Sequence, residues 1–250
     1  MTNHDNGQSL RQFVQRMTQS PAYQRGNAPQ FASEQVTRNP QSPLNGKRIA
    51  FLGSSVTAGF AARGRSFVDY LVACDGIIAT KSAVSGTTLA GHDQGGYLVR
   101  LQRDFPTSNK YDLFVCQLST NDNRHGKDLG HCTPPEQRDR FDETTTLGAI
   151  ERICQYVGCE LHCPLAFYTC LQDDSAGKYA TLIQQLQQLA AKWNFAIIDL
   201  FHNQELRTQT AAQPDAMFDD VHPTQEGYYQ IWLPVFEKEL TQILASKKGK

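Results

Sequence analysis

The sequence predicts an α/β protein: a three-layer α/β/α sandwich around a central, mostly parallel five-stranded sheet. From Lys47 onward, short apolar runs alternate with longer amphipathic segments, the order of strands and helices in right-handed crossover units. The first run, Ile49–Leu52, is continuously apolar, as in a parallel strand buried on both faces. With 250 residues, the chain can bury a sizeable core in one such domain.

The first 46 residues precede this alternation, and we expect them to form an N-terminal helix and an extended arm. The main domain then spans residues 47–250. The stretch Ser9-Leu-Arg-Gln12 fits the capping box that begins a helix. Pro21 ends this helix, and residues 22–46 are rich in Gln, Asn and Pro without any period. The apolar residues of the helix recur at helical spacing: Leu10, Phe13, Val14 and Met17.

Apolar segments in the main domain predict its strands and three of its helices. One helix has apolar positions from Leu147 to Val157, and another from Tyr179 to Leu189. Thr224 caps a last helix, which Pro234 bends. The five predicted strands are Ile49–Leu52, Ile77–Val84, Leu113–Leu118, Leu165–Tyr168 and Ala196–Leu200.

Composition narrows the function classes. A net charge of −1, spread along the chain, gives no electrostatic case for nucleic acid or an anionic membrane as partner. The first twenty residues carry no apolar core of a signal peptide, and no apolar run approaches the ~18 residues of a membrane span. Seven cysteines, an odd number, fit free thiols in a reducing compartment, so we expect a cytoplasmic protein.

The turn after the first strand is the first candidate site. Gly53 allows a tight turn at the carboxyl edge of the sheet, where open α/β sheets bind ligands. Free backbone N–H groups there can bind an anion or a developing oxyanion. Three familiar motifs do not fit: a P-loop needs Lys where Phe60 stands, a dinucleotide fingerprint needs Gly at Ser55, and a nucleophile elbow needs Gly at Thr57. We therefore expect no cofactor.

Three later stretches could supply partners for a serine nucleophile. In Asp219-Asp220-Val221-His222, a carboxylate can fold back onto the imidazole of a general base. Asn121 follows a predicted strand and offers an amide donor to an oxyanion, and Gly86 offers an unobstructed backbone N–H. Alone, the first stretch fits the end of a loop, and the other two fit ordinary turns.

In the order Ser, Gly, Asn, Asp-x-x-His, these four blocks resemble the SGNH hydrolases, or GDSL family of esterases and lipases, over about residues 47–245. The resemblance implies a flavodoxin-like fold with Ser55 as nucleophile, His222 as base and Asp219 as the residue that orients His222. It also implies an oxyanion hole made by the Ser55 and Gly86 N–H groups and the Asn121 side chain. Asp220 competes with Asp219, and the family spacing favours Asp219.

Two positions depart from the family pattern. Ser54 stands where the family has Asp beside the nucleophile, which can alter the rigidity and charge of the turn. Ser119 replaces the first Gly of the Gly-x-Asn-Asp block, and its Cβ could narrow the crevice. Neither change removes an attacking or proton-carrying group, so they bear on substrate range and rate more than on reaction type.

The leading functional hypothesis is a serine esterase that hydrolyses a small acyl ester, of short-chain or carbohydrate O-acetyl type. An O-acyltransferase using the same residues is one alternative, and a non-catalytic binding module with this fold is another. The expected partner is a small-molecule ester, and the oligomeric state stays open.

Two other segments leave alternatives open. Cysteines and His162 between residues 154 and 170 include Cys159-x₃-Cys163, which is loosely compatible with zinc. Because the segment leads into a buried strand, we expect structural thiols and no metal site. The loop 123–137, with two prolines and several basic residues, either lines the mouth of the crevice or is solvated.

Overall fold

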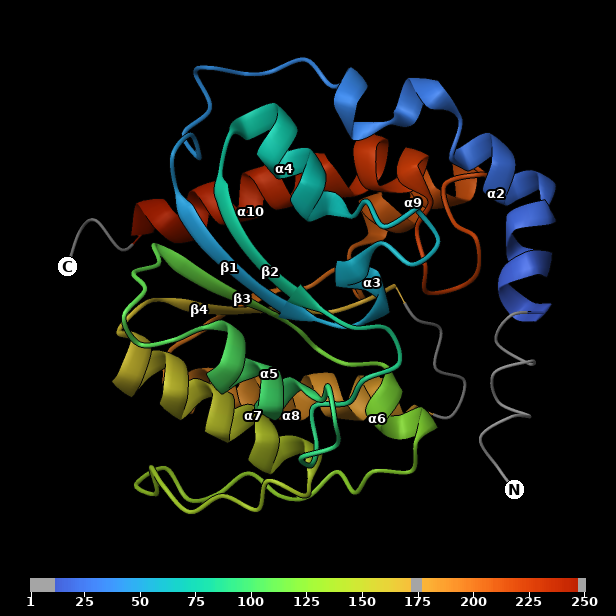
Figure 1. Ribbon diagram of the computed structural model, residues 1–250. Coiled ribbons are helices and arrows are strands. Elements are labelled where there is room, and N and C mark those ends of the chain that lie inside the picture. Colours follow the sequence, from blue (N-terminus) through green and yellow to red (C-terminus); the bar gives the residue numbers. More distant parts are fainter. Residues whose placement is uncertain (1–11, 172–176, 247–250) are drawn as a thin grey trace.

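The computed structural model describes residues 12–171 and 177–246 and confirms the three-layer architecture (Figure 1). Within these ranges, five strands form one sheet in the order β2-β1-β3-β4-β5, and every adjacent pair is parallel. Each predicted run coincides with one strand to within two residues at either end: β1 (Arg48–Gly53), β2 (Ile78–Ala83), β3 (Leu113–Gln117), β4 (Leu165–Tyr168) and β5 (Ala196–Ile198). In this strand order, the direction of winding changes between β1 and β3, which is where such folds open their ligand crevice.

Helices cover both faces of the sheet (Figure 1). One layer contains α4 (Phe67–Asp75) and α10 (Leu233–Ser246), with α9 (Gln204–Ala212) beside it. The other contains α5 (Tyr97–Asp104), α7 (Thr146–Gln155) and α8 (Lys178–Trp193). The sequence predicted α7, α8 and α10, but it did not predict α4, α5 or α9.

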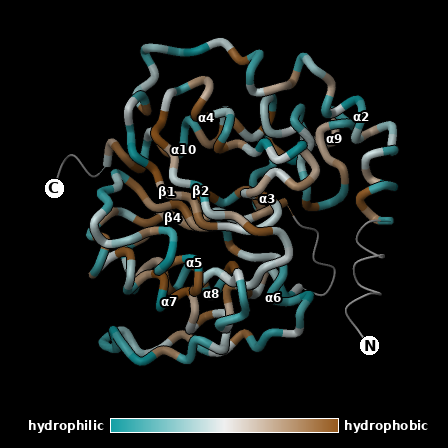
Figure 2. The backbone as a smooth tube through the Cα atoms, in the orientation of Figure 1, coloured by the Kyte–Doolittle hydropathy of each residue, from teal (hydrophilic) through white to brown (hydrophobic). Residues whose placement is uncertain are grey.

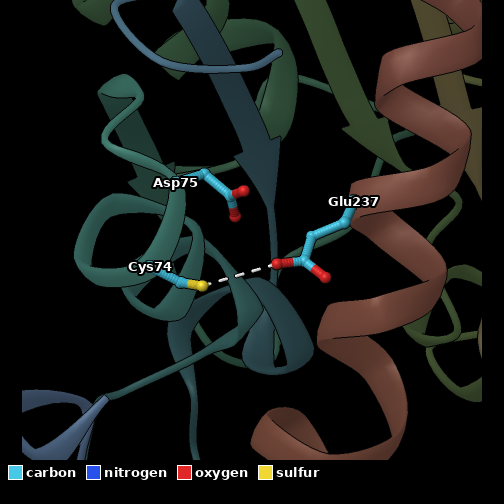
Figure 3. Close-up of side chains that lie close together, drawn as sticks. All are labelled: Cys74, Asp75 and Glu237. Carbon is cyan, nitrogen blue, oxygen red and sulfur yellow. Dashed lines mark hydrogen bonds between the residues drawn. The ribbon is translucent and has the colours of Figure 1, made fainter. Parts of the chain in front are cut away.

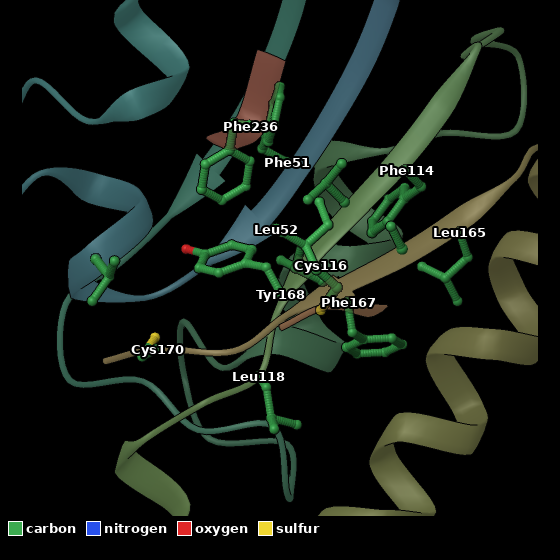
Figure 4. Packing of buried hydrophobic residues seen from close by; sticks show 14 of the residues in the cluster. Phe51, Leu52, Phe114, Cys116, Leu118, Leu165, Phe167, Tyr168, Cys170 and Phe236 are labelled. Atoms are coloured by element: carbon green, nitrogen blue, oxygen red, sulfur yellow. The ribbon is translucent and has the colours of Figure 1, made fainter. Parts of the chain in front are cut away.

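The core lies on both sides of the strands, as the hydropathy of the central strands indicates (Figure 2). Successive side chains of β4 point to opposite faces. The ring centroids of Tyr168 and of Phe236 in α10 lie 5.4 Å apart (Figure 4). On the other face, the ring centroids of Phe167 and Phe195 lie 5.0 Å apart. Fully burying an aromatic side chain of this size stabilises the fold by roughly 1.5–3 kcal/mol.

The N-terminal region is more helical than predicted. Residues 12–19 are helical, whereas the capping box at Ser9 lies outside the described residues. Pro21 ends this helix and also begins α2 (Pro21–Gly26), which Ser20 caps by accepting the Tyr23 N–H. Proline suits that place because a first helical residue needs no N–H donor. The prediction of an extended arm from residue 22 is therefore wrong for α2 and for the short 3₁₀ turns η1 (Pro29–Phe31) and η2 (Ser33–Gln35).

The last helical segment follows Thr224, as predicted. It passes through a π-helical stretch, η4 (Gly227–Trp232), before α10, in which Pro234 is the second residue. A wider turn is a common adjustment where a proline lacks its N–H donor. No helix in the described ranges has the length and apolar character needed to cross a membrane.

Candidate active site

Ser55 lies in a tight turn at the carboxyl end of β1. Gly53 ends the strand, and Ser55 begins the single-turn helix α3 (Ser55–Ala58). The turn admits only glycine at position 53, because a Cβ there would lie 1.7 Å from Thr57 Oγ1. The Ser55 residue is 6% exposed, at the sheet edge where the crevice between β1 and β3 opens.

A buried glutamine at the end of β3 holds this turn. Gln117 Oε1 accepts the backbone N–H of Ser54 at 2.9 Å and that of Thr57 at 3.2 Å. It also accepts the Thr57 hydroxyl at 2.8 Å, while Gln117 Nε2 donates to Ser54 Oγ at 3.0 Å. Ser54 is fully buried, so the serine that replaces the family aspartate is a partner of Gln117 and does not reach solvent.

The Asp-x-x-His loop brings its imidazole onto Ser55. His222 Nε2 lies 2.8 Å from Ser55 Oγ, and His222 Nδ1 lies 2.9 Å from both carboxylate oxygens of Asp219. The backbone N–H groups of Val221 and His222 donate to Asp219 Oδ1 at 2.9 and 2.8 Å. The three-residue spacing thus folds the carboxylate back over its own loop, as the sequence predicted.

The pKa of Asp219 reflects opposing effects. Partial burial of the carboxyl raises its pKa, but hydrogen bonds from the His222 ring and from two backbone N–H groups lower it further than burial raises it. The net pKa of Asp219 lies below its ordinary value, so the carboxylate stays ionised beside the imidazole. Asp220 is exposed and forms no hydrogen bond or ion pair with any described residue. The geometry therefore favours Asp219 over Asp220 as the partner of His222.

The predicted oxyanion groups lie on two neighbouring loops that contact each other. Asn121 begins α6 (Asn121–Arg124), and its Nδ2 donates to the Thr87 carbonyl at 2.9 Å. Ser119 is buried and accepts the Asn121 N–H at 3.0 Å, so this departure from the family pattern anchors Asn121. Gly86 has a φ of 79°, which favours glycine. The backbone N–H groups of Ser55 and Gly86 donate to no acceptor in the described part of the chain.

Two buried charged residues that the sequence pattern did not predict connect these loops. The fully buried Arg100 guanidinium donates to the Gly53 carbonyl at 2.8 Å and to Thr87 Oγ1 at 3.1 Å. The Asp122 carboxylate accepts the backbone N–H groups of Leu89 and Ala90, both at 2.9 Å. Arg100 therefore joins the Ser55 turn to the Gly86 loop, and Asp122 joins that loop to Asn121.

The loop after α6 does not line the crevice over its whole length. Residues 131–141 run along α7 and α8 (Figure 1), where Arg138 donates to the Lys192 carbonyl at 3.0 Å. Thr133 there bonds the buried Glu151. Only the first part of the loop, residues 126–129, borders a hollow of about 400 Å³, together with Ser119, Asp122 and the start of α8. The mouth-lining alternative is therefore wrong for residues 131–137 of the loop.

The cysteines near β4 are free thiols and do not converge on a metal site. Among the described residues, one group of three side chains could hold a metal ion: Cys74, Asp75 and Glu237 (Figure 3). Cys74 Sγ lies 3.5 Å from Glu237 Oε1, and the buried Asp75 accepts the Ser42 hydroxyl at 2.5 Å. Because Asp75 precedes β2, this group is at the amino edge of the sheet, roughly the length of a strand, ~16 Å, from Ser55.

The acidic pair in this group makes stability depend on pH. Burial, and then the nearby charge of Asp75, raise the pKa of Glu237 from its ordinary value of 4.5 to about 7. Because the folded protein holds this proton more tightly than the unfolded chain, the free energy of unfolding falls as pH rises from about 4.5 to about 7. Above that range the penalty stays constant.

Glu237→Gln is therefore expected to raise the melting temperature at pH 8 and to leave it nearly unchanged at pH 4.5. After a discount for the half-exposed side chain, the gain at pH 8 is roughly 1–2 kcal/mol. Thermal unfolding at both pH values measures it, with Glu239→Gln on the same helix as the matched control. An equal shift at both pH values would contradict the assignment.

Comparisons with known proteins bear on the family and the fold. The sequence matches the model of the GDSL-like lipase/acylhydrolase family over residues 51–230, and no curated protein matches it. A solved structure from Lactobacillus plantarum is 20% identical, with a TM-score of 0.61 over 81% of this chain and 98% of that one. A Bacteroides ovatus ATCC 8483 protein described as a GDSL-like lipase is 13% identical (TM-score 0.59; 79% and 99% covered). The acetyl xylan esterase AlAXEase is 15% identical (TM-score 0.52; 80% and 98% covered). At these identities, the structural likeness supports the fold alone.

Proposed function

The chain belongs to the GDSL-like lipase/acylhydrolase family, and from this premise we propose that it is a serine esterase that forms an acyl-enzyme. The substrate we propose is a small acyl ester, of short-chain or carbohydrate O-acetyl type. One observation carries the proposal: an unbroken chain of contacts runs from Asp219 through both ring nitrogens of His222 to Ser55 Oγ, with every link between 2.8 and 2.9 Å.

In this mechanism, Ser55 Oγ attacks the ester carbonyl while His222 Nε2 takes its proton. Asp219 accepts the Nδ1–H and stabilises the imidazolium that forms. His222 then gives the proton to the departing alcohol, and the acyl group remains on Ser55. His222 Nε2 then takes a proton from water, which attacks the acyl-enzyme, and returns that proton to Ser55 Oγ as the acid leaves.

Three N–H donors are proposed to stabilise the tetrahedral oxyanion. The Ser55 and Gly86 N–H groups have no acceptor among described residues. An amide nitrogen carries two protons, and Asn121 Nδ2 uses one for the Thr87 carbonyl, which leaves the other for substrate. Such donors lower the barrier because the charge they meet develops in the transition state.

Asn121→Ala is expected to lower kcat by about 10²–10³ with little change in KM, because the lost donor acts mainly in the transition state. Asn123→Ala on the same short helix is the control. Its kcat is expected to stay within about twofold of wild type, because the side chain is not one of the proposed oxyanion donors. Steady-state kinetics with a chromogenic acetate gives both numbers. A higher KM with an unchanged kcat would mean that Asn121 binds substrate without stabilising the oxyanion.

The substrate class is tested with esters that differ in one part at a time. A panel would compare acetate, butyrate and octanoate esters of one alcohol with an acetylated sugar, using Ser55→Ala as the blank. We expect acetates to be cleaved fastest and octanoates slowest. Equal activity of wild type and Ser55→Ala on every ester would overturn the proposed function. Faster cleavage of octanoates than of acetates would overturn the proposed preference for a small acyl group. Product analysis with an added alcohol separates hydrolysis from acyl transfer.

A further inference from the structure

The N-terminal segment, residues 12–27, lies outside the stretch that the family shares yet packs against the candidate active site. The family match begins at residue 51, and the compared structures cover 79–81% of this chain. Together with side chains near Ser55 and His222 in the sequence, the segment forms a small apolar cluster that is separate from the main core. Its buried members are Met17, Tyr23 and Ala61, with Val14, Phe60 and Phe218 packed against them.

A buried asparagine ties this segment to both halves of the site. Asn27 is fully buried, and its Nδ2 donates to the Ala61 carbonyl at 2.9 Å, six residues after Ser55. Its Oδ1 accepts the Gln225 N–H at 3.2 Å, three residues after His222. One amide group thus holds the turn that follows Ser55 against the helix start that follows His222.

A second contact fixes the same loop. Arg25 forms a two-pronged ion pair with Asp215, at 2.7 and 2.8 Å. The backbone of Gly26 approaches so closely that a Cβ there would lie 2.1 Å from the Asp215 carbonyl. The exposed Arg25–Asp215 pair is weak on its own. The close backbone contact shows that α2 packs tightly against Asp215, at the start of the loop that leads to His222.

Aromatic rings extend from this segment to His222. The Phe60 ring lies 5.3 Å from the imidazole of His222, and Phe13 stacks on Phe60 with centroids 6.2 Å apart and planes 14° apart. Phe13 also meets the edge of Phe218 at 6.3 Å, and 39% of Phe13 remains exposed. The rings of Phe60 and Phe13 therefore form one aromatic wall, which extends from the imidazole of His222 to the solvent.

We infer that residues 12–27 complete the active site: Asn27 positions the His222 loop against the Ser55 turn, and Phe13 with Phe60 binds the alcohol part of the substrate. The inference rests on the proposed function. Because His222 gives its proton to the departing alcohol, that alcohol leaves on the His222 side, beside Phe60. The wall suits an alcohol with a flat apolar face, such as an aromatic ring or the apolar face of a sugar ring.

Three acetates that differ only in their alcohol test the wall: methyl acetate, phenyl acetate and an acetylated sugar. Phe13→Ala is expected to raise KM about 3- to 10-fold for the ring-bearing acetates, with no change for methyl acetate. Gln15→Ala, on the same helix, is the matched control. An effect confined to phenyl acetate identifies an aryl alcohol, and one confined to the sugar identifies a carbohydrate.

In one contrary outcome, the ratio of KM for a ring-bearing acetate to KM for methyl acetate is the same in Phe13→Ala and in wild type, while cleavage still depends on Ser55. That result would overturn the binding role of the aromatic wall and leave the esterase proposal standing. Cleavage that does not need Ser55 would overturn the esterase proposal itself. The two failures are therefore distinct.

The positioning role of Asn27 is tested through kcat and labelling. Asn27→Ala is expected to lower kcat about tenfold for methyl acetate at unchanged KM, and to slow fluorophosphonate labelling of Ser55 by the same factor. Ser42→Ala removes a buried hydrogen bond at the far edge of the sheet and controls for lost stability, since it should lower the melting temperature without slowing kcat. Equal kcat in Asn27→Ala and wild type, well below the melting temperature, would contradict the positioning role.

Discussion

Ser55→Ala is expected to lower kcat/KM for a chromogenic acetate by about 10⁴–10⁶, leaving only the background that oxyanion donors and binding provide. The substitution removes the attacking oxygen and few interactions that hold the fold, because the one side-chain hydrogen bond of Ser55 Oγ among the described residues is with the His222 ring. The melting temperature should therefore stay within about 2 °C of wild type, as for a change without structural cost.

Ser85→Ala is the matched control for this result. Ser85 is exposed on the neighbouring Gly86 loop, and its loss should leave kcat/KM within about twofold of wild type. If Ser55→Ala kept more than a tenth of the activity while fully folded, a different nucleophile or a directly activated water would have to do the work.

Asp219→Asn is expected to lower kcat by about 10³–10⁴, whereas Asp220→Asn should change it less than about threefold. An asparagine at 219 fits the same space, but it no longer compensates the imidazolium and can hold the wrong tautomer of His222. Asp220 serves as the matched control because it has the same charge, stands next in sequence, and forms no hydrogen bond or ion pair with the described His222.

The kinetics of the two variants should be measured over a range of pH with one ester. A larger loss at position 220 would show that the loop rearranges when substrate binds and would reverse the assignment. Equal, small losses at both positions would mean that Ser55 and His222 act as a pair, without need of a carboxylate.

Much of the fold was predictable because the buried parallel strands are short apolar runs with clear ends. The missed helices have identifiable reasons. In α5 the buried Arg100 interrupts the apolar stripe, and α9 buries only Leu206. The start of α4 did carry a signal, since Ser66 and Asp69 form a capping box.

The residues Ser55, Asp219 and His222 were predicted from the sequence because four short blocks, in order along the chain, resemble the SGNH hydrolases. The groups that support them could not be predicted, since Gln117 reaches Ser54 across 63 residues and Arg100 reaches Gly53 across 47. A weak signal existed: Gln117 is a polar residue at the end of an otherwise apolar strand. Buried polar side chains of this kind are held by hydrogen bonds, so such a residue predicts a partner without naming it.

The N-terminal segment shows the same limit. Its helix was predictable from the spacing of Phe13, Val14 and Met17, but its position was not. The contacts that place it are made by Asn27 with Ala61 and Gln225, which are distant in sequence and carry no motif. Only the tertiary structure shows that Asn27 joins the turn after Ser55 to the helix start after His222.

Activation of the Ser55 nucleophile by His222 is the central proposal, and one labelling experiment tests it directly. The protein is treated with a fluorophosphonate, digested, and examined by mass spectrometry, alongside the His222→Ala variant. We predict a single adduct on the peptide containing Ser55 in the wild type, with labelling slowed at least about 10³-fold in His222→Ala. An adduct on another residue, or labelling at the same rate without His222, would contradict it.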